Sequence, residues 1–127
     1  NRIGGIATSG FGGRSFSKGI ATAAVIAAES CRVADAWATL VGNAAFYPDP
    51  AIRQLPANIL DPNTDLQEEL VTVKVGNISP VTVERALVNA LEFAKQLVQQ
   101  KKIIGAAVFY KDAFKCYPRN FIKELRG

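Results

Sequence analysis

The sequence has 127 residues, of which 49% are hydrophobic and 20% are charged. This composition is typical of a globular protein with one core, and it excludes an intrinsically disordered chain. No apolar run approaches the roughly 18 residues that a membrane-spanning helix needs, and no basic and apolar leader precedes the first expected strand. We therefore expect a cytoplasmic protein without membrane contact.

The net charge of +4 is concentrated near the C-terminal end. Residues 101–127 hold seven basic and two acidic residues, whereas the first hundred hold eight basic and nine acidic residues. The basic residues near the end are mostly single lysines spread among apolar residues. A surface that follows a nucleic-acid backbone would show a denser stripe with arginine. We interpret the lysines as solvated surface or a subunit contact, and expect no nucleic-acid partner.

The cysteine and histidine counts limit the possible metal sites. Cys31 and Cys116 are too far apart in sequence for a metal knuckle or a redox pair, and the chain contains no His. A zinc site is therefore not expected. We predict that both cysteines are buried thiols in a reducing compartment.

The first half of the chain predicts two strands and a helix. Ile3–Ser9 and Lys18–Ala28 are short apolar stretches typical of buried strands. The glycine-rich segment Ser9–Gly13 between them can turn sharply. Ser30 is a natural N-cap for a helix over 31–45, which the following asparagine and prolines end.

The second half predicts a turn-rich excursion, a strand, a long helix and a final hairpin. Four prolines favour turns and short helical pieces in the excursion. The long helix opens with Ser-Pro, which places proline at the first helical position. The expected ranges are 47–69 for the excursion, 71–75 for the strand, 80–102 for the helix, and 103–110 and 114–117 for the hairpin.

This order of elements predicts an α/β fold, more narrowly α+β, with a mixed or antiparallel sheet and packed helices. We expect residues 1–127 to be a single domain or the carboxy-terminal portion of a longer protein. Because a strand-like segment begins almost at Asn1, we also expect an upstream half or a partner chain, in a homo- or hetero-oligomer.

The first candidate site is on the expected helix 31–45. Asp35 is the only charged residue between Arg32 and Asp49 in a segment expected to be buried, where a carboxylate needs a partner. Thr39 follows one helical turn later, so both oxygens could bind a hard cation such as magnesium. Alternatively, Asp35 caps a loop amide or pairs with Arg32 or Arg14, and Thr39 bonds its own backbone.

The second candidate site is the glycine-rich segment. Thr8, Ser9, Gly10, Arg14 and Ser15 offer hydroxyl, backbone N–H and guanidinium donors for an anionic ligand. The segment lacks the Gly-Lys-Ser/Thr ending of a P-loop, and an ordinary hairpin turn is the alternative interpretation. Without a His to act as base, the serines have no support as nucleophiles, so no catalytic residue is assigned.

Several runs of residues resemble the carboxy-terminal half of ApbE-like proteins, nearest to the uncharacterised ApbE-related branch once labelled thiamine-biosynthesis-like. The similarity covers about residues 3–110. The runs that carry it are Gly5–Gly10, Arg14–Ala21, Val33–Thr39, Leu60–Leu66, Leu70–Gly76 and Ile104–Ala107.

This resemblance implies a magnesium-dependent flavin transferase, which attaches flavin mononucleotide from FAD to a Thr or Ser of a target protein. It implies that Asp35 and Thr39 are metal ligands and that Thr8, Ser9 and Gly10 lie beside the substrate pocket. The chain departs from the family pattern because it has no His after the Thr-Ser-Gly turn.

Two functions follow as expectations. The first is an enzyme portion that binds an anionic small molecule, such as a flavin nucleotide or another phosphorylated or carboxylated compound. With a divalent cation, Mg²⁺ above all, it would catalyse transfer or hydrolysis. The second is a non-catalytic ligand-binding or assembly subunit that retains the fold.

Overall fold

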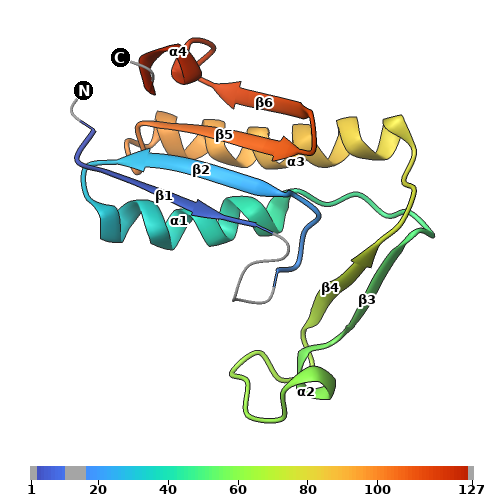
Figure 1. The fold of residues 1–127 in the computed structure, drawn as a ribbon. Helices are drawn as coiled ribbons and strands as arrows, with labels where there is room; N and C mark the ends of the chain where they lie inside the picture. The colour runs from blue at the N-terminus through green and yellow to red at the C-terminus, as the bar shows by residue number, and fades with distance from the viewer. Residues whose placement is uncertain (1–2, 11–16, 126–127) are drawn as a thin grey trace.

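The main sheet has four antiparallel strands in the order β1-β2-β5-β6 (Figure 1). The structure is a computed structural model that describes residues 3–10 and 17–125. The expected α+β class with an antiparallel sheet and packed helices is confirmed. All four strands were predicted, although β2 begins five residues later than expected. The strands are β1 Gly5–Ser9, β2 Ala23–Ala28, β5 Gly105–Tyr110 and β6 Ala113–Tyr117.

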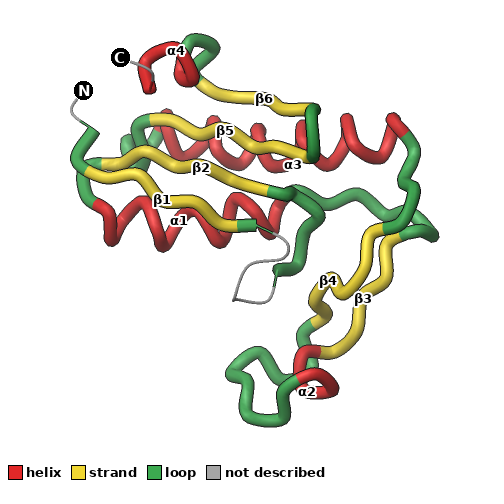
Figure 2. The backbone as a smooth tube through the Cα atoms, in the orientation of Figure 1, coloured by secondary structure: helices red, strands yellow, loops and turns green. Residues whose placement is uncertain are grey.

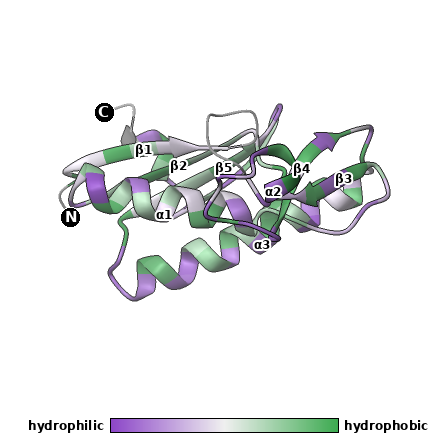
Figure 3. Ribbon diagram, turned by 90° about the horizontal axis from the view of Figure 1, so that it is seen from below, coloured by the Kyte–Doolittle hydropathy of each residue, from purple (hydrophilic) through white to green (hydrophobic). Residues whose placement is uncertain are grey.

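Two helices, α1 (Cys31–Ala44) and α3 (Pro80–Gln99), cover one face of this sheet (Figure 1). Their predicted N-caps are confirmed: the Ser30 hydroxyl accepts from the Val33 N–H, and the Ser79 hydroxyl accepts from the Thr82 N–H. Hydrophobic and hydrophilic residues alternate along both helices (Figure 3), as one-sided burial requires. Small side chains let the layers approach closely, and the fully buried ones in this core include Ala24, Ala28, Ala34, Ala38, Ala86, Ala90, Ala94 and Ala106.

The opposite face of the sheet is covered only in part. A short helix that was not predicted, α4 (Phe121–Leu125), places Phe121 against Ala27 and Ala107. Elsewhere this face shows apolar side chains to solvent. Ile6 is 49% exposed and Phe114 is 52% exposed.

A second, two-stranded sheet forms an arm beside this body (Figure 2). Its strands are β3 (Ile52–Pro56) and β4 (Leu70–Val75), and α2 (Ala57–Leu60) follows β3. We call residues 52–75 the arm and the rest the body. The expectation of only turns and helical pieces over 47–69 was wrong, because β3 is a strand. Its proline takes the last strand position, where a missing N–H does not break the pairing.

The entry and exit of the arm are joined at a neck. The Asp49 carboxylate accepts hydrogen bonds from the Ala51 N–H at 2.9 Å, the Thr82 hydroxyl at 2.7 Å and the Ser79 N–H at 3.4 Å. These bonds, the one from Ala51 first, hold the pKa of Asp49 below its usual value of 3.8. The Gly76 N–H also bonds the Ala51 carbonyl at 2.9 Å.

The described helices are too short or too polar to cross a bilayer. Over residues 3–10 and 17–125, none reaches the length and apolarity of a membrane span.

Candidate functional site

The structure places Asp35 on the surface, which corrects the expectation that it is buried. The buried side of α1 is formed by Ala34, Ala38, Val41 and Gly42. Asp35 follows Ala34 by one position, so a rotation of about 100° carries its side chain off that face. The side chain is exposed, and within the described part of the chain it forms no ion pair or hydrogen bond.

The cysteines also differ from the prediction. Both are free thiols, but Cys31 at the start of α1 is exposed, and Cys116 on β6 is only partly buried. The exposure of Cys31 has the same origin as that of Asp35, since small residues of α1 fill the helix–sheet contact. The expectation of two buried thiols was therefore wrong.

The end of β1 lies beside the last turns of α1. Ser9 pairs with Ala24, and a Cβ atom added to Gly42 would lie only 3.8 Å from the Ala24 Cβ. Ala7 packs against the core on the α1 side, so Ser9, two residues later, points to the same side of the sheet. This register brings Ser9 to the level of Thr39 and Asn43 on α1.

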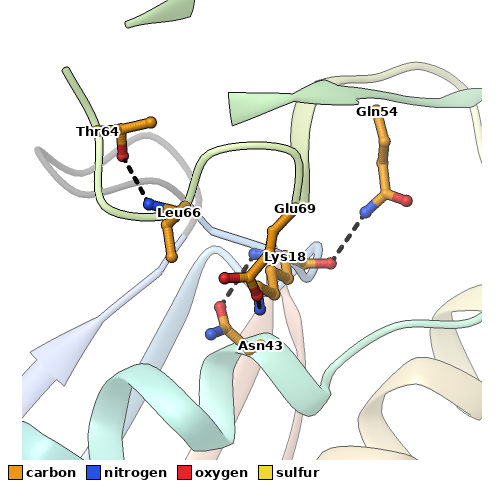
Figure 4. Close-up of polar contacts among 6 residues, drawn as sticks. All are labelled: Lys18, Asn43, Gln54, Thr64, Leu66 and Glu69. Atoms are coloured by element: carbon orange, nitrogen blue, oxygen red, sulfur yellow. Dashed lines mark hydrogen bonds and ion pairs between the residues drawn. The ribbon is translucent and has the colours of Figure 1, made fainter. Parts of the chain in front are cut away.

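The segment Ser17–Gly19 closes this corner of the body. The Lys18 N–H bonds the Asn43 side-chain oxygen at 2.9 Å (Figure 4), and the Gly19 N–H bonds the Ser17 hydroxyl at 3.2 Å. Gly19 lies so close to the end of α1 that an added Cβ would be 2.2 Å from the Gly42 carbonyl oxygen. The segment is therefore fixed against α1 by backbone contacts that only glycine permits.

The arm holds the other side of the same segment. The Gln54 amide donates to the Lys18 carbonyl at 3.1 Å (Figure 4). It also donates to the Thr72 hydroxyl at 3.3 Å. The Thr72 N–H bonds the Ser17 carbonyl at 2.7 Å. The Lys18 ammonium pairs with the Glu69 carboxylate, and both side chains of this pair are well exposed.

We call this region the Lys18 corner, formed by Ser9, Ser17–Gly19, Thr39, Asn43 and the arm residues Gln54, Glu69 and Thr72. Ser9, Gly10 and Thr39 from the sequence analysis lie at or next to it. Thr8 is exposed on the opposite side of β1. Arg14 and Ser15 lie outside the described residues, so their expected role stays a prediction.

Seven residues of the corner were not predicted as site residues: Ser17, Lys18, Gly19, Asn43, Gln54, Glu69 and Thr72. Asn43 continues the spacing of Asp35 and Thr39 by one more turn, and this polar stripe along α1 is a signal that could have identified it. The three arm residues gave no such signal, because they reach the corner only when the arm folds back on the body.

A divalent cation fits Asp35 and Thr39 only in part. One carboxylate and one hydroxyl supply two oxygens, whereas Mg²⁺ takes six ligands in an octahedron. Among residues 3–10 and 17–125, no group of three or more His, Cys, Asp or Glu side chains could hold a metal ion. Water or an anionic ligand would have to complete the coordination.

Comparison with known protein families gives a match over most of the chain. A protein-family model, AbpE_bact, described as AbpE bacteria, matches residues 1–116, which is most of the chain. The chain belongs to the AbpE_bact family. Searches of curated proteins and of solved structures find no match.

Membership of the AbpE_bact family overturns the expectation of an ApbE-like protein. That resemblance rested on short runs of small residues, and the structure gives many of them a packing role. An added Cβ at Gly5 would lie 2.2 Å from the Cys31 nitrogen, and Ala34 and Ala38 fill the helix–sheet contact. Close packing of a helix on a strand selects such residues whatever the activity.

Proposed function

We propose that the Lys18 corner binds a small anionic molecule, and that a divalent cation joins it at Asp35 and Thr39. The observation that carries this proposal is the contrast between the backbone and the side chain of Lys18. The backbone is fixed on both sides, by Asn43 and by Gln54. Among the described residues, the ammonium is held only by Glu69, in a pair whose side chains are 38% and 50% exposed.

A ligand anion can compete with Glu69 for this ammonium. An exposed ion pair contributes only about 0.2–1 kcal/mol, because water screens it. A phosphate or carboxylate group has more than one oxygen, so it can accept from the ammonium and from the Ser9 hydroxyl together. The fixed backbone means that little conformational entropy is lost when the ligand binds.

The cation and the anion should bind together. Asp35 and Thr39 leave most of an octahedral shell open, and the oxygens of a phosphorylated ligand are suitable to complete it. This coupling is the reason to keep Mg²⁺ in the proposal, although Asp35 is exposed. Flavin nucleotides stay in the proposal as one class of ligand, although the resemblance that suggested them is overturned.

Binding without turnover is a second candidate, next to transfer or hydrolysis of the bound molecule. The 127-residue sequence has no His, the residue that serves most often as a general base near neutral pH. The partner chain expected from the sequence also stays a proposal, for which the uncovered side of the sheet around Ile6 and Phe114 is the candidate surface.

Thermal denaturation with inorganic pyrophosphate, Mg²⁺, or both tests the proposal. We expect the pair to raise the Tm of the wild type by several degrees, and by more than the two separate effects combined. Asp35→Ala should abolish the excess, and Lys18→Gln should remove the effect of pyrophosphate. Both substitutions leave the hydrogen bonds of the main chain in place.

Asp112→Ala is the matched control, because Asp112 is an exposed carboxylate in the turn between β5 and β6. It should respond like the wild type. An equal shift in Asp35→Ala and Asp112→Ala would refute the cation site, and no shift in any protein with pyrophosphate, FMN or FAD would refute anion binding. Release of AMP from FAD, or of phosphate from pyrophosphate, would identify turnover.

A further inference from the structure

A cleft lies at the end of the helical layer that is remote from the Lys18 corner. It has a volume of about 520 Å³ and lies between the start of α1 and the end of α3, which are neighbours in Figure 1. This volume is in the range of small-molecule sites. Its lining residues are Glu29, Val33, Val98, Lys101, Lys102, Ile103 and Ile104.

The cleft is separate from the proposed anion site. Glu29 and Val33 lie at the start of α1, whereas Thr39 and Asn43 lie toward its other end. A helix of 14 residues is about 20 Å long, so one small molecule cannot occupy both places.

One wall of the cleft is apolar and partly open to solvent. Val33 is 37% exposed although it is in the first turn of a well-packed helix, and Val98 and Ile104 are half-buried. A ligand with an apolar body would remove this surface from water, which favours binding in proportion to the area covered. The wall therefore selects for a hydrocarbon or aromatic group.

The rim of the cleft carries two adjacent lysines in a defined backbone turn. The Lys102 N–H bonds the Leu97 carbonyl at 2.9 Å, and the Lys101 N–H bonds the Val98 carbonyl at 3.0 Å. This pattern ends α3 in a Schellman motif, in which glycine is the usual residue at the left-handed position. Lys101 takes that position with φ of 61°. A charged side chain thus occupies a position where glycine would be more stable.

The charges of the cleft favour an anion. Lys101 and Lys102 form no ion pair with any described residue, and Glu29 is the one acidic residue in the lining. The Lys102 ammonium lies 5.3 Å from the centre of the Trp37 ring, so this side chain extends along the helical layer. The lining therefore carries one net positive charge beside its apolar wall.

We propose that this cleft binds a small amphipathic monoanion, with its carboxylate at Lys101 and Lys102 and its apolar body on Val33, Val98 and Ile104. The family match assigns no role to these residues, and none of them belongs to the Lys18 corner. The binding is non-covalent and leaves the ligand unchanged.

Calorimetric titration with octanoate tests the proposal, with 1-octanol as the neutral probe of the same length. We expect the wild type to bind octanoate at least tenfold more tightly than 1-octanol. Lys101→Gly and Lys102→Gln should each weaken octanoate binding about tenfold and leave 1-octanol unchanged, because each removes a charged donor. Val33→Ser should weaken both probes.

The variants distinguish a loss of octanoate binding from a loss of folding and from an effect at the Lys18 corner. Lys101→Gly relieves the left-handed backbone of Lys101, so its Tm should stay equal or rise while the octanoate affinity falls. Lys74→Gln is the charge-matched control on the arm, and Asp35→Ala is the control for the Lys18 corner. Both should bind octanoate like the wild type.

The proposal is overturned if octanoate produces no saturable heat at millimolar concentration, or if 1-octanol binds equally well. It is also overturned if Lys101→Gly and Lys102→Gln bind octanoate as tightly as Lys74→Gln. None of these results depends on whether pyrophosphate or Mg²⁺ binds at the Lys18 corner.

Discussion

The body and the arm bury different kinds of residue. In the body, Ile26, Val41 and Val108 are fully buried with a set of alanines between the sheet and two helices. In the arm, Ile59 is 67% exposed and Leu70 is 52% exposed. The body thus has a continuous apolar core, whereas the arm is a hairpin in which only Ala57 and Val71 are fully buried apolar residues.

The arm is held to the body by polar contacts and, at its base, by Ile52 and Val75, which pack against the body core. Gln54 and Thr72 bond the Ser17–Gly19 segment, and Asp49 joins the neck to the start of α3. Each such hydrogen bond contributes only about 1 kcal/mol net, so the arm can open at a smaller free-energy cost than the body. The comparison teaches that the core fixes the base of the arm, whereas the arm side of the Lys18 corner depends on a few polar bonds.

The largest expected effect is on the body. Gly5→Ala places a Cβ atom 2.2 Å from the Cys31 nitrogen, so β1 and α1 must move apart. We expect the free energy of unfolding to fall by about 3 kcal/mol. For a chain of this size the Tm should fall by roughly 10 °C, measured by circular dichroism.

The matched control for Gly5→Ala is Gly76→Ala at the neck. There an added Cβ would lie 3.4 Å from the Ala51 carbonyl oxygen, which is an ordinary contact. Its Tm should differ little from that of the wild type. A similar loss in both variants would mean that the neck is packed as tightly as the body.

A smaller and more local effect is expected from Gln54→Ala. This change removes the donor to the Lys18 carbonyl and to the Thr72 hydroxyl. The arm should open more readily, by about 1.4 kcal/mol, which corresponds to about tenfold faster amide exchange in β3 and β4. Exchange in β2 and β5 should not change.

Arg53→Ala is the neighbouring control, because Arg53 is exposed on the same strand. It should leave the exchange of the arm unchanged. If Gln54→Ala accelerated exchange equally in the body, the arm and the body would be a single cooperative unit, and the comparison between them would fail.

The smallest effect is a pH dependence at the neck. The pKa of Asp49 is lowered in the folded protein, so its carboxylate stabilises the fold above the unfolded value of 3.8. This stabilisation is lost as the pH falls through the lowered native pKa. The stability difference between the wild type and Asp49→Ala, from urea unfolding, should therefore be constant near neutral pH and shrink below pH 3.8.

A difference that stays constant down to the lowest pH would contradict the proposed role of the Asp49 charge. Because the difference between the two proteins is measured, the titration of other carboxylates largely cancels. Loss of the Asp49 charge should also make amide exchange faster at the start of α3, because the Asp49 carboxylate accepts hydrogen bonds from Ser79 and Thr82.

Most of the body could be predicted from the sequence. Ser30 and Ser79 mark the starts of α1 and α3, and the apolar runs mark the main strands, because caps and periodicity are local properties of the chain.

The site could be predicted only in part. Ser9 and Thr39 were identified by their residue types, but the burial of Asp35 was predicted wrongly. A lone charge between small residues does not show which side of the helix it faces.

The sequence by itself determined the α+β class, the order of the main strands and helices, and the positions of both helix caps. The tertiary structure alone decided that β3 pairs with β4 outside the main sheet, and that Gln54, Glu69 and Thr72 meet Lys18. The physical reason is range: a cap or an apolar period acts within a few residues. The bonds of the Lys18 corner join residues as far apart in sequence as Ser17 and Thr72, and they form only when the arm folds back on the body.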